Sequence, residues 1–143
     1  MVKKLVTAQF FSLTTARIIL GIVFFAHGWR SMFTVGPGQT GRFFESLGIP
    51  LPNFFAWVVG LTELFGGALL ILGLAVPLVA VALIIDMLVA MFTVHIDKGF
   101  FSMNGGIELN LVLIAGLLAV AAVPQTSLGL DALILKKKLE SSK

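Results

Sequence analysis

The sequence predicts an all-α membrane protein: a four-helix transmembrane bundle with both termini in the cytoplasm. Of the 143 residues, 58% are hydrophobic and only 12% are charged, whereas a soluble domain has about 25% charged residues. The mean hydropathy is +1.06. Four segments meet or approach the roughly 20 apolar residues that a bilayer-spanning helix needs. This composition argues against a disordered chain, a coiled coil or a nucleic-acid-binding protein.

The four segments cover about residues 13–33, 54–74, 77–96 and 107–123. Each should be helical, because lipid offers no partners for free backbone N–H and C=O groups. Pro77 suits the first turn of a helix, and Pro124 suits the position just after one. The length allows one domain over residues 1–143.

Basic residues gather at the two chain ends, which predicts the orientation. Six lie there and three lie in the loops of the opposite side, so the positive-inside rule places both termini in the cytoplasm. Trp29 and Trp57 fall near the opposite interface, as in an aromatic belt, and Arg17 is expected to extend toward the cytoplasmic side. The terminal residues are Lys3, Lys4, Lys136, Lys137, Lys138 and Lys143, and the loop residues are Arg30, Arg42 and Lys98.

The long loop over residues 34–53 and the tail each contain an amphipathic stretch. Residues 41–47 predict a short helix that lies on the membrane surface, and residues 128–133 predict a second one. Neither stretch is long enough to cross a bilayer.

Ionisable side chains inside a bilayer are costly and usually face the bundle interior. Each of the four segments places one such residue in the outer half: His27, Glu63, His95 and Glu108. This convergence predicts a polar pocket. We assign proton-transferring, catalytic roles to Glu63 and His27, and ligand-binding roles to His27, Arg30, His95, Glu108 and Asn104.

Structural roles are the alternative for these residues. His27 can simply pair with an acid, Arg30 can be a solvated rim charge, and Glu108 can be a favourable acid in a first helical turn. Asp86 is expected to serve a helix contact, on a stripe with Ala90 and Thr93. His95 lies about 180° around a regular helix from Asp86. If the helix is regular, either His95 belongs to the loop or one of the two residues faces another subunit.

Cofactor and metal motifs are weak. The absence of cysteine excludes disulfides and thiol nucleophiles. No His-x-x-His or Glu-x-x-His spacing occurs, so no metal site is assigned. Of the two cofactor hypotheses, a haem held between His27 and His95 is less well supported than a bound quinone.

Several sequence pieces resemble the DoxX family of small four-helix bacterial membrane proteins, which includes relatives of the DoxD subunit of archaeal thiosulfate:quinone oxidoreductase. Arg30 departs from this pattern, because the family commonly has lysine there. The similar pieces are Arg17–Gly21, Phe25–Gly28, Leu47–Pro50, Glu63–Gly67, Leu72–Leu74, Phe92–His95 with Gly99-Phe100, Asn104–Glu108 and Ser127–Asp131.

The resemblance implies a multi-pass protein of the bacterial inner membrane that is tied to redox or sulfur metabolism. The function expected first is a subunit of an oxidoreductase system that handles quinone or a small sulfur or oxygen species, with a role in oxidative stress. Expected partners are lipid and soluble enzymes such as superoxide dismutase or a sulfurtransferase. A homo-oligomer is a further expectation. The alternatives are a non-catalytic anchor or assembly factor for soluble redox enzymes, and a small-solute transporter.

Overall fold

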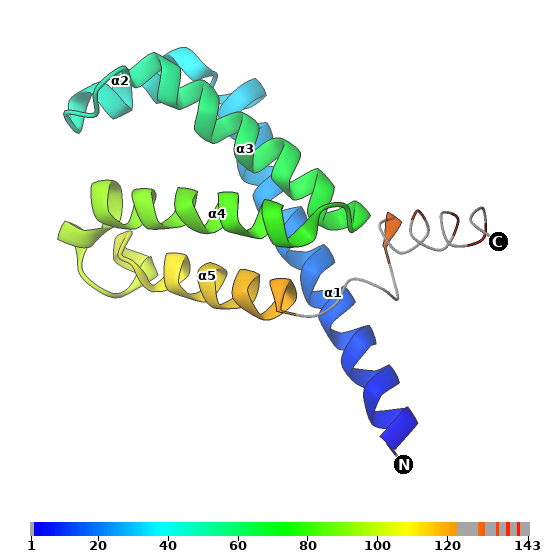
Figure 1. Cartoon of the computed structure of the whole chain (residues 1–143). Coiled ribbons are helices and arrows are strands. Elements are labelled where there is room, and N and C mark those ends of the chain that lie inside the picture. Colours follow the sequence, from blue (N-terminus) through cyan, green and yellow to red (C-terminus); the bar gives the residue numbers. More distant parts are fainter. Residues whose placement is uncertain (1, 123–128, 131–133, 135–136, 138–139, 141–143) are drawn as a thin grey trace.

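The computed structural model describes residues 2–122, 129–130, 134, 137 and 140, with side chains from residue 9 onward. Every regular element in this part of the chain is helical (Figure 1). The α-helices are α1 (Val2–Trp29), α2 (Pro37–Ser46), α3 (Pro52–Leu72), α4 (Val76–Ala90) and α5 (Glu108–Ala121). The predicted end of the last segment at residue 123 lies outside the described residues, as does most of the predicted helix over 128–133.

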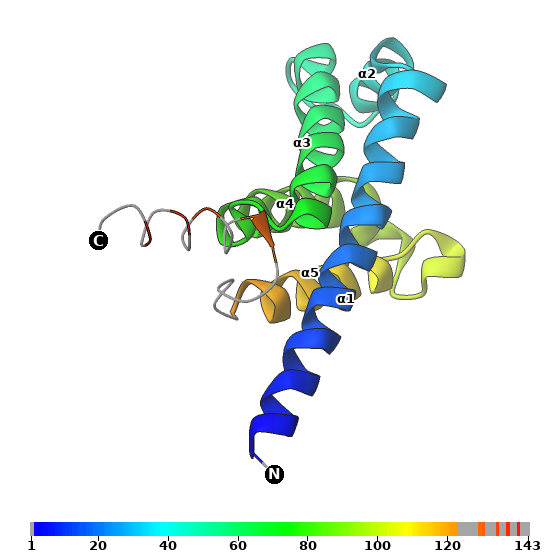
Figure 2. The same ribbon diagram turned by 90° about the vertical axis from the view of Figure 1, so that its right-hand side faces the viewer.

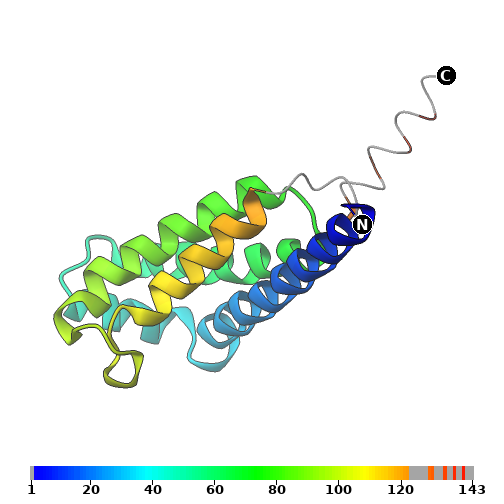
Figure 3. The same cartoon turned by 90° about the horizontal axis from the view of Figure 1, so that it is seen from below.

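The long helices form two antiparallel pairs. The α1–α3 pair and the α4–α5 pair cross each other, which Figures 1 and 2 show from two sides. Seen from below, α1, α4 and α5 nevertheless run along a common direction (Figure 3). One end of the molecule contains α2 and the α4–α5 connection, and we call it the α2 end. The α3–α4 turn lies at the opposite end.

Two helices become wider at the α2 end. A π-helical turn, η1 (Arg30–Thr34), continues α1, and its Val35 N–H donates to Arg30 O at 2.8 Å. A second π turn, η2 (Met91–His95), continues α4. Short 3₁₀ turns, η3 (Ile96–Lys98) and η4 (Ser102–Asn104), follow in the α4–α5 connection. π turns are rare and often occur at functional sites.

Three of the four predicted membrane segments are confirmed as helices that are long and apolar enough to cross a membrane: Gln9–Thr34, Pro52–Leu72 and Val76–Lys98. The predicted start at residue 13 is wrong, because α1 begins at Val2 and no glycine or proline before Arg17 interrupts it. α5 has 14 residues, or roughly 21 Å, which is shorter than the roughly 30 Å apolar core of a bilayer.

Proline and glycine set the helix ends, as the sequence indicates. Pro52 and Pro77 lie in the first turns of α3 and α4, where a missing N–H costs nothing. α3 ends at Gly73, whose φ of 71° is left-handed, and the next residue, Leu74, donates its N–H to Leu69 O at 3.0 Å. This is the hydrogen bond of a Schellman motif. The helix predicted within residues 41–47 is also present, as part of the longer α2.

Glycine residues allow α1 and α3 to pack backbone against backbone. A Cβ atom at Gly28 would overlap the backbone of Leu64, and a Cβ atom at Gly67 would overlap the backbone N of Phe25. At Gly21, a Cβ atom would lie 2.7 Å from the Ile71 side chain. Small residues at such positions let membrane helices approach closely.

The apolar core fills the half of the molecule near the α3–α4 turn. Arg17 lies there too. It is only 4% exposed, and its guanidinium lies against Gly73 at the end of α3, which is the end of the molecule toward which it was expected to extend. The partial negative charge of a helix C-terminus favours a cation at this position. The largest fully buried side chains are Phe24, Leu70, Val76, Leu83, Leu117 and Val120.

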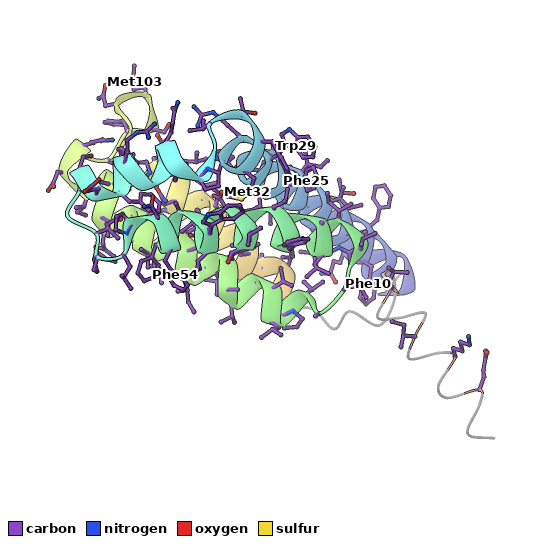
Figure 4. All side chains as sticks on the ribbon, turned by 90° about the horizontal axis from the view of Figure 1, so that it is seen from above. Phe10, Phe25, Trp29, Met32, Phe54 and Met103 are labelled. Carbon is purple, nitrogen blue, oxygen red and sulfur yellow. The ribbon has the colours of Figure 1, made fainter. Side chains whose placement is uncertain are left out.

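Aromatic side chains cover the outward face of α1 toward the α2 end. Figure 4 shows Phe25 and Trp29 on this face, and the Trp29 ring lies 4.5 Å from that of Phe33. Trp29 and Trp57 are both about half exposed, as expected for residues of an aromatic belt. Met103 protrudes from the α4–α5 connection (Figure 4).

The glycine contact predicts that Gly67→Ala destabilises the fold. The new methyl group would overlap the α1 backbone, and overpacking of this kind costs about 1–3 kcal/mol. Thermal unfolding of the purified protein in detergent should show a lower midpoint. Gly116→Ala is the matched control, because the added Cβ atom meets only the end of the Leu20 side chain, at 3.2 Å. A Gly67→Ala protein as stable as the control would contradict the packing argument.

Candidate functional site

The α1–α3 glycine contact places two of the predicted site residues at nearly the same height. Gly28 packs on Leu64, and His27 and Glu63 precede these two residues. Because the helices run antiparallel, His27 and Glu63 lie on opposite sides of this contact along the axis, about 3 Å apart in height. Glu63 is only 7% exposed. No hydrogen bond to its carboxyl group occurs among the described residues. A hydrogen-bond partner for this group would therefore have to be a molecule in the space around it.

Two cavities meet at these residues. The α5-side cavity has a volume of about 200 Å³ and lies between α1, α4 and α5. The α2-side cavity has a volume of about 460 Å³ and reaches from the same centre to α2 and η1. Both are lined by His27, Glu63, Ala90 and His95. Of the four ionisable residues predicted to converge, His27, Glu63 and His95 line both cavities, whereas Glu108 lines neither.

The π turn η2 explains how His95 reaches this centre. One extra residue in a turn shifts every later side chain by roughly 100° relative to a regular helix. The premise of a regular helix was therefore wrong: His95 lies at the end of η2 and lines both cavities. Neither the loop placement nor the contact with another subunit is needed to explain its position.

A backbone carbonyl fixes the tautomer of His95. The Nδ1 atom lies 2.5 Å from Gly105 O. Because a carbonyl oxygen only accepts, Nδ1 must donate its hydrogen. In the neutral imidazole, Nε2 is then left as an acceptor.

The remaining predicted residues separate into two groups. Arg30 lines the α2-side cavity together with Gln39 and Thr40. Glu108 lines neither cavity: its Oε2 accepts the backbone N–H of Ser102 at 2.9 Å, so it fixes the η4 turn. Asn104 is exposed in that turn and also lines neither cavity. Asn104 thus lies in the connection that borders the site, and Glu108 lies at the start of α5 and holds that connection.

Asn110 belongs to the site and was missed by the sequence analysis. It is 5% exposed, lines the α5-side cavity and donates from Nδ2 to Met87 O at 3.3 Å. It ties α5 to α4 one turn before η2. The stripe of Gly106, Asn110, Leu113 and Leu117 at helical spacing was the available signal.

Asp86 lines a third cavity, of about 350 Å³, which we call the apolar cavity. The predicted stripe is confirmed, because Ala90 and Thr93 line the same cavity. Asp86 and Glu63 lie near enough to interact electrostatically. The apolar cavity shares four lining residues with the α2-side cavity: Phe44, Val59, Ala90 and Val94.

Cofactor binding at this site would depend on imidazole, carboxyl and guanidinium groups. Among the described residues, no three His, Asp or Glu side chains come close enough to hold a metal ion. The side chains that face the two central cavities can accept, donate or transfer protons.

The sequence matches a known protein family and bacterial proteins. The DoxX family model matches residues 12–96, which include His27, Glu63 and His95. A Bacillus subtilis (strain 168) protein named "Putative oxidoreductase CatD" is 36% identical over 122 residues, which cover 85% of this chain and 86% of that protein. No solved structure matches the chain.

A second relative comes from Mycobacterium tuberculosis (strain ATCC 25618 / H37Rv) and is named "Uncharacterized membrane protein Rv3486". It is 31% identical over 120 residues, which cover 75% of this chain and 71% of the relative. The family match spans α1 to η2, so it contains both π turns and the three residues that line the two central cavities. The chain is a membrane protein of the DoxX family.

Proposed function

We propose that the chain is a membrane subunit of an oxidoreductase system and that its redox ligand binds in the two cavities that meet at Glu63. One observation carries the proposal: His27, Glu63 and His95, from three different helical segments, line the same two cavities. The name of the Bacillus subtilis relative, "Putative oxidoreductase CatD", supports the reaction class.

The chemistry requires groups that take up and release protons. Conversion between a quinone and a hydroquinone moves two protons with two electrons, and a small sulfur or oxygen species also changes its protonation when it is reduced. Glu63 is the buried group of the pair and His27 the exposed one, and both line the wider α2-side cavity. His95 offers Nε2 as an acceptor, since Gly105 O holds its other nitrogen. Arg30 can bind an anionic group near η1.

We place the protein in the bacterial inner membrane with both termini in the cytoplasm and α5 as the fourth crossing. α1 begins and α5 ends away from the α2 end (Figure 1), as an even number of crossings requires. The site then opens toward the outer side.

Glu63→Gln should abolish the redox function. Glutamine keeps the shape and the hydrogen-bonding capacity but cannot exchange a proton, and positioned acid–base groups contribute about 100-fold or more to rates. The measurement is survival under oxidative and thiol stress of a strain with Glu63→Gln, beside the deletion strain. Glu45→Gln, an exposed acid on α2, is the control. Normal survival of the mutant beside a sensitive deletion strain would favour the anchor function instead.

His95→Asn tests the role of Nε2 separately from the loop contact. Asparagine can still donate from Nδ2 to Gly105 O but has no atom at the Nε2 position. We expect an unfolding midpoint near that of the wild type and a loss of function of about 100-fold. Wild-type function in His95→Asn would exclude Nε2 from the chemistry.

The orientation predicts how single cysteines are labelled, and the absence of native cysteine makes the test clean. In intact spheroplasts, a membrane-impermeant maleimide should label Gly38→Cys. Thr7→Cys should be labelled only after the membrane is permeabilised. Labelling of both positions without permeabilisation would refute a crossing of the membrane by α1 with the N-terminus inside.

A further inference from the structure

The apolar cavity beside the redox site has an unusual lining. It lies between α2, the α2–α3 connection, α3 and α4, and its volume of about 350 Å³ is within the range of small-molecule pockets. Its walls are aromatic and aliphatic, with Asp86 as the one ionisable residue among them. The side chains that matter here are Phe44, Ile49, Phe55, Val59, Asp86 and Thr93.

The polar atoms of this cavity have unused capacity to accept hydrogen bonds. Asp86 Oδ2 is buried and has no hydrogen-bond partner among the described residues. Thr93 Oγ1 already donates its hydrogen to Val89 O, at 2.8 Å, so toward the cavity it can only accept. Buried polar groups are nearly always paired, and an exception calls for an explanation such as an absent ligand.

We propose that the apolar cavity binds an uncharged, apolar molecule with a hydroxyl group that donates a hydrogen bond to Asp86. A hydroxyl group is the donor that fits both protonation states of the acid: it donates to a carboxylate, and it both donates to and accepts from a carboxylic acid. A ligand carbonyl or ether oxygen pairs only with the protonated acid. An ammonium group would place a positive charge among walls that are otherwise aromatic and aliphatic, where burying a charge is costly.

The position of the cavity connects this ligand to the redox site. Phe44, Val59, Ala90 and Val94 line both the apolar and the α2-side cavity. A molecule held at Asp86 therefore lies in the cavity next to the one that Glu63 lines. That the bound molecule is a redox substrate rests on the function proposed above. That the apolar cavity binds such a molecule does not.

The test compares two probes of nearly the same shape. 2-Naphthol has the hydroxyl donor, and 2-methoxynaphthalene lacks it. Saturable changes in the fluorescence of each probe, measured with the purified protein in detergent, give the two dissociation constants. We expect 2-naphthol to bind at least about tenfold more tightly, because a hydrogen bond to a charged group is worth that factor or more. Equal affinities, or no saturable binding of 2-naphthol, would overturn the proposal.

Variants locate the binding. Asp86→Leu should weaken 2-naphthol at least about tenfold, and Asp86→Asn, which keeps one acceptor oxygen, should weaken it less. Val89→Phe narrows the apolar cavity and should also weaken binding. Val81→Phe, on the same helix and similarly exposed but outside the three cavities, is its control. If Asp86→Leu does not fold, the Val89 and Val81 pair decides, and equal binding by these two would overturn the proposal.

The failure of this inference differs from the failure of the proposed function. Glu63→Gln should still bind 2-naphthol, because Glu63 does not line the apolar cavity. Wild-type binding by Asp86→Leu, together with a redox defect in Glu63→Gln, would refute the ligand site and leave the proposed function standing. Lost binding in Asp86→Leu, together with a normal Glu63→Gln strain, would support the ligand site and refute the proposed function.

Discussion

The close contact of α1 and α3 is the constraint on which the rest of the structure depends. Lipid gives no hydrophobic driving force for helix association, so membrane helices stay together through close packing. Here the backbones of the two helices are in contact at Gly28 and Gly67. A larger side chain at either position would not permit so close an approach. The same contact sets how the two helices are aligned. His27 and Glu63, which precede Gly28 and Leu64 on antiparallel helices, come within one helical turn of each other along the pair.

The site follows from a difference between the two halves of the molecule. Near the α3–α4 turn the helices are filled by core side chains, and Arg17 is buried against the end of α3. Toward the α2 end, π turns widen two helices, and cavities take the place of the core. Polar groups are tolerated there because backbone and side chains of the connection satisfy some of them, as Gly105 O does for His95.

The sequence alone predicts most of the architecture, because apolar length, proline and glycine act locally. The bounds of α3 and of the helical span that begins with α4 are predicted within a few residues. The sequence also predicts that His27 and Glu63 line a common cavity. The positions of His95 and Glu108 are not predictable in this way. A π turn has no clear sequence signature, so His95 could not be assigned to a face. Glu108 looked like a site residue until the fold of the α4–α5 connection placed the Ser102 N–H beside it.

Ala90 gives the three cavities a common wall. It is the last residue of α4 before the π turn, and it lines the α5-side, α2-side and apolar cavities alike. A methyl group there leaves little bulk between compartments of different polarity. A larger side chain at this position would intrude on all three cavities at once, and it would change their shared boundary without changing any group proposed to transfer protons.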